Sequence, residues 1–63
     1  MTVGERIRHL RHAAGMTLED CAHAAGWARA SSWADVEHDR RAARVATLRR
    51  VAAVLGVPIA ELL

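Results

Sequence analysis

The segment from Met16 to Glu37 constrains the fold of this chain more than any other stretch. Thr17 belongs to the residue types that cap the N-terminus of a helix, and Asp20 stands where a side chain can complete that cap. Small and apolar residues then recur on one helical face: Leu18, Cys21, Ala22 and Ala25. Gly26 follows and is a typical helix terminator. These features predict a short helix over about 18–25.

A second short helix is expected after this glycine, over about 29–38. Its inward face repeats Ala30, Trp33 and Val36 at helical spacing. The opposite face carries small polar side chains: Ser31, Ser32 and Asp35. Two short helices joined by a glycine-containing turn are typical of a helix-turn-helix, which presents its second helix to a duplex groove. Residues 17–38 are therefore predicted to form such a motif, with the polar face free to meet base edges.

The length and composition of the chain predict one all-α domain. A chain of 63 residues buries only about 60% of the surface that its unfolded form exposes, so a large catalytic cleft is not expected. Hydrophobic residues make up 52% of the sequence and aromatic residues only 3%, because alanine supplies much of the apolar content. Alanine favours helix more than any other residue. We therefore expect a helical, non-enzymatic domain that spans residues 1–63.

Further helices are predicted on either side of the motif. Thr2 and Glu5 have the spacing of a capping box, and the apolar stripe behind them ends at Gly15, which predicts a helix over about 3–14. This stripe consists of Val3, Ile7, Leu10 and Ala14. After the loop that follows the motif, another helix is predicted from residues at core spacing: Val45, Leu48, Ala52 and Leu55. Gly56 ends it.

The C-terminal residues predict a fifth, short helix over about 59–62, since Pro58 suits a first helical turn. Leu62 is placed to close the core of the monomer, whereas Ile59 and Leu63 share another face. This surplus of apolar residues predicts a homodimer with an interface at the C-terminal end. Its expected residues are Val54, Val57, Ile59 and Leu63. The alternative is a monomer in which Leu63 frays into solvent until DNA brings two copies together.

The charged residues favour a polyanionic partner such as double-stranded DNA. All 9 basic residues are arginines, the net charge is +2 and the sequence pI is about 10.0. Three of the arginines cluster directly after the second helix of the motif: Arg40, Arg41 and Arg44. Such a cluster fits contacts with phosphates, although a solvated loop can have the same composition.

Other classes of function have little support in the sequence. The single cysteine, Cys21, cannot form an internal disulfide and fits an inward helix face as a small hydrophobe. His9 and His12 share the first helix without the further ligands of a metal site, so they read as surface histidines. No apolar run is long enough for a membrane span or a signal peptide. We expect a cytoplasmic, nucleoid-associated protein with no cofactor, metal, membrane contact or small-molecule ligand.

Four segments resemble the Cro/repressor-type, or XRE-like, helix-turn-helix family of transcription regulators. They are GERIRHLR at 4–11, GMTLEDCA at 15–22, DVE at 35–37 and LRRVAAVLGVPIAELL at 48–63. They resemble the first helix of the family, the start of its second helix, the end of its recognition helix and its last two helices. The resemblance covers essentially the whole chain and implies a compact five-helix domain that binds DNA.

The resemblance also implies roles for individual residues. In this family an arginine of the first helix pairs with a glutamate that ends the recognition helix, and the matching residues are Arg11 and Glu37. The base-reading positions correspond to Ser31, Ser32 and Asp35, and the backbone-contacting residues to Arg29, Arg40, Arg41 and Arg44. Phosphate contacts would fix the register while the short side chains read base edges.

The chain departs from the family pattern within the helix-turn-helix. Leu18 stands where the family usually has a glutamine that touches a phosphate, so this contact is not expected. The stretch from Gly26 to Glu37 has one residue more than the usual spacing, which predicts an enlarged turn around Trp27 and Ala28.

Two further departures lie at the ends of the recognition helix. Arg29 stands near the place of the usual small polar cap, and Asp39 and Ala43 replace the glycine and the proline of the loop. Asp39 can adopt a left-handed conformation, though less easily than glycine. These changes leave the predicted fold intact and concern individual DNA contacts.

Two functions are compatible with this sequence. The first is a sequence-specific DNA-binding transcriptional regulator, a homodimer with one recognition helix per half-site in successive major grooves. No separate oligomerisation domain is expected after Leu63, so the last helices would have to form the dimer. The second is a protein-interaction module that keeps the fold but has lost DNA binding, which Leu18, Asp35 and the modest net charge favour. Steep salt dependence of binding to random duplex DNA would distinguish the first from the second.

Overall fold

Two capping boxes start the first two helices of the structure, a computed structural model that describes residues 1–40 and 44–63. Thr2 Oγ1 accepts a hydrogen bond from the Glu5 backbone N–H (3.1 Å), and Glu5 Oε1 accepts one from the Thr2 N–H (2.8 Å). Thr17 and Asp20 repeat this exchange, with both bonds at 3.0 Å. The helices that follow are α1 (Val3–Ala13) and α2 (Leu18–Ala24). Both helices therefore begin where the sequence predicts.

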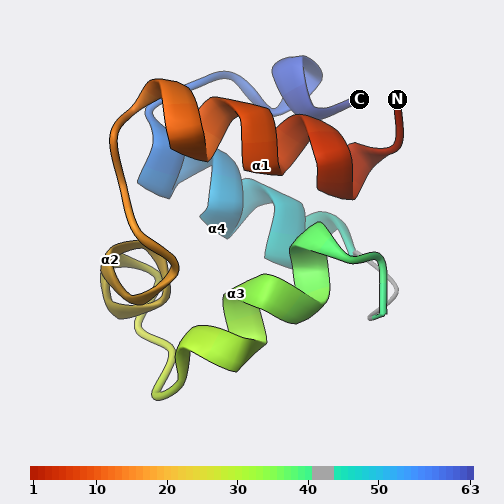
Figure 1. The fold of residues 1–63 in the computed structure, drawn as a ribbon. Coiled ribbons are helices and arrows are strands. Elements are labelled where there is room, and N and C mark those ends of the chain that lie inside the picture. The colour runs from red at the N-terminus through yellow and green to blue at the C-terminus, as the bar shows by residue number, and fades with distance from the viewer. Residues whose placement is uncertain (41–43) are drawn as a thin grey trace.

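The predicted helix-turn-helix is formed by α2 and α3 (Ala30–Glu37). Figure 1 shows α4 (Val45–Leu55) between α1 and α3, while α2 stands to one side and leads through a turn into α3. α3 packs on α1 and α2, and α4 packs on the same two helices, so each helix contacts at least two others. The observed helices are one or two residues shorter than predicted, because the flanking residues serve as caps.

The last predicted helix is the one that differs from expectation. Gly56 adopts the left-handed conformation (φ 69°) that ends α4, as predicted. Ile59–Leu62 then forms a 3-10 helix, η1, so the described residues contain four α-helices and not five. Its hydrogen bonds join Glu61 N to Pro58 O (2.9 Å) and Leu63 N to Ala60 O (3.2 Å). A segment this short, just after a proline, closes with these tighter three-residue bonds.

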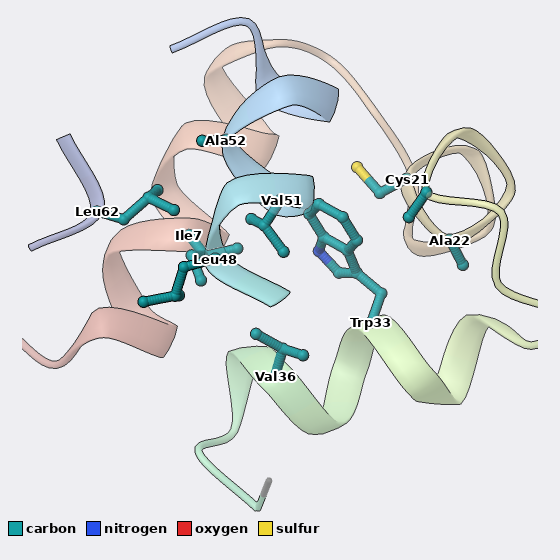
Figure 2. Packing of buried hydrophobic residues seen from close by; sticks show 10 residues of the cluster. Ile7, Cys21, Ala22, Trp33, Val36, Leu48, Val51, Ala52 and Leu62 are labelled. Carbon is teal, nitrogen blue, oxygen red and sulfur yellow. The ribbon is translucent and has the colours of Figure 1, made fainter. Parts of the chain in front are cut away.

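Trp33 is the centre of the core and is fully buried. In Figure 2 its indole reaches from α3 toward Val51 of α4, with Cys21 of α2 on one side. Leu62 of η1 lies beside Ile7 of α1 in the same view and is also fully buried. Cys21 is thus a small buried hydrophobe, and Leu62 closes the core from the C-terminal end, both as predicted.

None of the helices in the described ranges combines the length and the apolar character needed to cross a membrane.

Candidate nucleic-acid interface

A buried ion pair anchors the end of α3 to α1. Arg11 Nε donates to Glu37 Oε2 at 2.6 Å, and Arg11 Nη2 donates to Glu37 Oε1 at 3.2 Å. The two side chains are only 10% and 3% exposed. This two-bond geometry suits a guanidinium and a carboxylate, and the expected pair is therefore present. The bond to Glu37 raises the pKa of Arg11 above its usual value, so the guanidinium stays charged.

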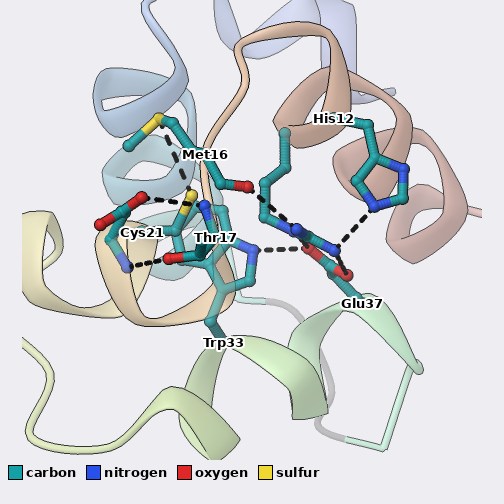
Figure 3. Close-up of polar contacts among 8 residues, drawn as sticks. His12, Met16, Thr17, Cys21, Trp33 and Glu37 are labelled. Carbon is teal, nitrogen blue, oxygen red and sulfur yellow. Dashed lines mark hydrogen bonds and ion pairs between the residues drawn. The ribbon is translucent and has the colours of Figure 1, made fainter.

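Further groups join this ion pair in a polar cluster. Trp33 Nε1 donates to Glu37 Oε2 at 2.7 Å, so the buried carboxylate also orients the central indole (Figure 3). Arg11 Nη1 donates to the backbone oxygen of Met16 at 3.0 Å, which ties the loop before α2 to the same guanidinium. A buried charge costs least when all its hydrogen bonds are made, as they are here. The cluster joins α1, the start of the helix-turn-helix and α3.

The outer face of α3 carries the three predicted base-reading residues. Ser31 is exposed, while Ser32 and Asp35 are half-buried. The carboxylate of Asp35 accepts a bond from Arg40 Nη1 at 3.4 Å, an ion pair at the surface. Such surface pairs contribute about 1 kcal/mol or less and exchange easily for other partners. These three residues give the outer face of α3 short, polar side chains.

The predicted backbone-contacting arginines lie at the ends of helices. Arg29 is exposed and occupies the N-cap position of α3, where it makes no side-chain cap bond. Arg40 is exposed directly after the C-terminal end of α3, and Arg44 is exposed at the N-cap of α4. Arg41 lies outside the described residues. Arginine side chains thus flank α3 at both ends.

The turn between α2 and α3 is stabilised by aromatic packing and by a hydrogen bond from α4. Trp27 is half-buried, and its ring centroid is 5.8 Å from that of Trp33, with a tilt of 51°. Arg50 of α4 donates to the backbone oxygen of Ala25 at the end of α2 (2.9 Å). Gly26 has a positive φ of 78°, which lets the chain turn away from α2 at this point. α2 and α3 thus remain packed on each other across the turn.

The contacts of Asp39 are not predicted by any local pattern. Asp39 has a φ of 56°, as expected of a residue that replaces the family's glycine. Its Oδ1 accepts a bond from the Gly4 N–H (3.2 Å), and its Oδ2 accepts one from the Thr2 hydroxyl (2.8 Å). The left-handed conformation costs an ordinary residue about 1–2 kcal/mol, which these bonds at the N-terminus of α1 help to offset. Ala43, which replaces the family's proline, lies outside the described residues.

The residues expected at a dimer interface lie on one stretch of the chain, after the middle of α4. Val54, Val57 and Ile59 are half-buried, and Leu63 is 73% exposed. Leu63 is one of the few large apolar side chains that the described part of the chain leaves open to solvent. The arrangement leaves apolar surface next to a closed monomer core.

Comparison with known proteins agrees with this architecture. Residues 2–63 match the model of a helix-turn-helix domain family. The fold is similar to the crystal structure of the restriction-modification controller protein C.AhdI from Aeromonas hydrophila, with a TM-score of 0.90 and 30% sequence identity. That match covers 97% of this chain and 91% of the other. No curated protein matches significantly. The family match over nearly every residue, together with the solved relative, shows that the chain belongs to the Cro/repressor-type (XRE-like) helix-turn-helix family.

Proposed function

We propose that this chain is a sequence-specific DNA-binding transcription regulator that acts as a homodimer and places α3 in the major groove. The proposal rests on how α3 is held in the fold and on which side chains it exposes. Its inner face is fixed by Trp33 and by the Arg11–Glu37 pair, while its outer face offers short polar side chains between exposed arginines. A rigidly held helix with a small polar face and flanking cations is suited to a DNA groove.

The two kinds of side chain would do different work. Arg29, Arg40, Arg41 and Arg44 would contact phosphates and fix the register of the protein on the duplex. Ser31, Ser32 and Asp35 would meet base edges, and the Asp35 carboxylate could accept a hydrogen bond from a cytosine amino group. In the free protein this carboxylate is paired with Arg40. DNA would exchange that weak pair for two contacts, one to a base and one to a phosphate.

The similarity to C.AhdI supports a regulatory role, since that protein is described as a restriction-modification controller. Regulators with this motif commonly bind as dimers to two half-sites about 34 Å apart. The apolar patch formed by Val54, Val57, Ile59 and Leu63 would supply the self-complementary contact that two-fold symmetry requires. Sedimentation of the parent and of Ile59→Asp tests this interface. We expect a dimer that Ile59→Asp dissociates; a parent that stays monomeric well above its DNA-binding concentration would contradict it.

DNA binding itself is tested by titrating the protein onto random duplex DNA at several salt concentrations. Phosphate contacts predict steep weakening with salt, and Arg40→Ala should reduce the salt slope by about one unit. Arg8→Ala is the matched control, because Arg8 is an equally charged, exposed residue on α1 outside the proposed interface. Equal effects of the two substitutions would contradict the proposed placement of the interface.

Base reading needs a separate test. Selection of bound sites from a random duplex library should return a roughly palindromic sequence. Asp35→Ala should then relax the preference at one position per half-site, by about 1–3 kcal/mol of discrimination. If it instead tightened binding to every sequence equally, Asp35 would be a repelling charge and not a base-reading residue.

A second candidate function is a protein-interaction module that has lost DNA binding. The first turn of α2 favours it, because Glu19 and Asp20 are exposed there and Leu18 replaces the family's phosphate-touching glutamine. Acidic side chains in this position would repel a DNA backbone. The salt titration decides between the two candidates, since an interaction module would show no steep dependence on salt.

A further inference from the structure

The end of α3 is attached to the first turn of α1 by the carboxylate of Asp39. This carboxylate accepts hydrogen bonds from the Gly4 N–H at 3.2 Å and from the Thr2 hydroxyl at 2.8 Å. The Gly4 N–H is one of the amides at a helix N-terminus that lack a partner within the helix, and a negative charge is favourable there. Asp39 therefore caps α1 from a position 35 residues further along the chain.

The close approach of the two segments depends on Gly4. A Cβ atom at this position would collide with the backbone carbonyl of Glu37 and would crowd the Asp39 carboxylate. Only glycine lets the first turn of α1 lie directly against the end of α3. The contact is thus built from both sides, by a missing side chain on α1 and an added carboxylate after α3.

Two acidic residues near the end of α3 consequently bind the two ends of α1. Glu37 is bonded to Arg11 in the last turn of α1, and Asp39 is bonded to Gly4 in the first. These two attachment points are about 10 Å apart along the helix. Two separated attachments fix the direction of a segment as well as its position, which a single ion pair cannot do.

Asp39 immediately precedes Arg40, one of the arginines proposed to contact phosphates. The Arg40 N–H is bonded to the backbone oxygen of Asp35 at 3.0 Å, so the chain leaves α3 in a defined direction. An acidic residue at this place would, by its charge alone, weaken binding to a phosphate backbone. Its hydrogen bonds to α1 give it a structural reason to be there.

We propose that Asp39 is a positioning residue for DNA binding: through its hydrogen bonds to the first turn of α1, its carboxylate directs the adjacent Arg40 toward the DNA backbone. The inference rests on the proposed DNA-binding function and adds to it a residue that touches no DNA. It predicts that removal of a negative charge near the interface weakens DNA binding, whereas electrostatics alone would strengthen it.

The experiment compares the parent with Asp39→Gly and Asp39→Asn, at a temperature where circular dichroism shows all three to be folded. Affinity for a random duplex is measured as a function of salt. Asp39→Gly keeps the left-handed backbone but loses the carboxylate, so we expect roughly five-fold weaker binding and a salt slope lower by about one unit. Asp39→Asn keeps an oxygen for the Gly4 N–H and should stay within about two-fold of the parent.

Each alternative role gives a different pattern. If Asp39 acted only through its charge, both variants would bind more tightly than the parent. If only its backbone conformation mattered, Asp39→Gly would bind as well as the parent or better. Either pattern overturns the positioning role while leaving DNA binding intact. A parent without salt-dependent binding would overturn the proposed function and, with it, this inference.

A second measurement tests the attachment in the absence of DNA. Hydrogen exchange of the Gly4 amide should be slow in the parent and in Asp39→Asn and should lose its protection in Asp39→Gly. Unchanged protection in Asp39→Gly would show that the carboxylate does not dock on α1, whatever the DNA affinity of the variant.

Discussion

The two ends of α3 are held by different kinds of interaction. The C-terminal end is tied to α1 by charge-assisted hydrogen bonds, which Arg11 donates to Glu37 and the first turn of α1 donates to Asp39. The N-terminal end starts at Arg29, which provides no side-chain cap, and follows a turn supported by the packing of Trp27 and, at the end of α2, by the bond from Arg50 to Ala25. Directional bonds to ionised groups fix geometry more tightly than apolar packing. We infer that α3 is rigid at its C-terminal end, which leads to Arg40, and adjustable at its N-terminal end.

The largest loss of stability is expected from substitution of Trp33, which contacts residues at both ends of α3. Trp33 packs on Trp27 and donates to Glu37, and it is fully buried. Trp33→Ala should cost about 3–5 kcal/mol, which would leave a domain of this size largely unfolded. Trp27→Ala, at the half-buried ring, should cost about 1–2 kcal/mol. Thermal melts of the two variants measure both values, and equal losses would remove the proposed difference between the ends.

The C-terminal anchor is tested by a double-mutant cycle. Arg11→Met or Glu37→Leu alone strands a buried charge, which can cost about 3–5 kcal/mol, whereas the double variant should lose much less than the sum. We expect a coupling energy of about 1–3 kcal/mol from urea denaturation of the four proteins. A coupling near zero would mean that the pair does not anchor α3.

The N-terminal end can be strengthened by giving it the cap that it lacks. Arg29→Ser places a good N-cap residue before α3 and should be about 1 kcal/mol more stable than Arg29→Ala. Both variants remove the same charge, so both should lower the salt slope of DNA binding by about one unit. If the serine variant is no more stable than the alanine variant, the missing cap does not limit this end of the helix.

The smallest effect is expected from acid. The backbone hydrogen bonds of Thr2 and Thr17 lower the pKa of Glu5 and Asp20, respectively, from ordinary values of 4.5 and 3.8. Since the pKa values of both carboxyl groups are lower in the folded state, the ionised groups stabilise the folded protein. This contribution is complete above the ordinary pKa values and is lost as pH falls through the pKa values of the folded state. Stability should therefore decline from about pH 4.5 downward.

Two variants assign this decline to one end or the other. Glu5→Gln weakens the cap of α1, on which the C-terminal end of α3 is docked, and Asp20→Asn weakens the cap of α2, which precedes its N-terminal end. In a plot of melting temperature against pH, each variant should lose part of the decline that the parent shows at acid pH. A variant that keeps the parent's acid slope would show that its carboxylate contributes nothing to it.

Residue spacing in the sequence predicts most of the fold, because the residues that begin and end the helices act on their near neighbours in the chain. The capping pairs that begin at Thr2 and Thr17, and the glycine after α4, act within one helical turn, and each marks a boundary that the structure contains. The 3-10 geometry of Ile59–Leu62 depends on the length of the segment, because four residues make too short a pattern to distinguish a 3-10 helix from an α-helix.

The contacts of the candidate site likewise include some that the sequence predicts and others that it does not. The Arg11–Glu37 pair follows from family resemblance, and the bond from Trp33 to Glu37 could be anticipated from their spacing of four residues on one helix. The docking of Asp39 on α1 joins residues 35 positions apart, and Arg50 reaches Ala25 over 25 positions. No periodicity connects such residues, since their meeting depends on how finished helices pack.

The pairing of Trp27 with Trp33 has a spectroscopic consequence. The sequence has no tyrosine or phenylalanine, so these two indoles are its only aromatic chromophores besides the histidines. Their ring centres are 5.8 Å apart, close enough for their ultraviolet transitions to couple. One ring is sealed in the core and the other reaches solvent, so a soluble quencher would address Trp27 alone. The molecule thus carries an intrinsic optical probe beside the turn that enters α3, and unmodified protein can report whether that turn rearranges when a duplex is added.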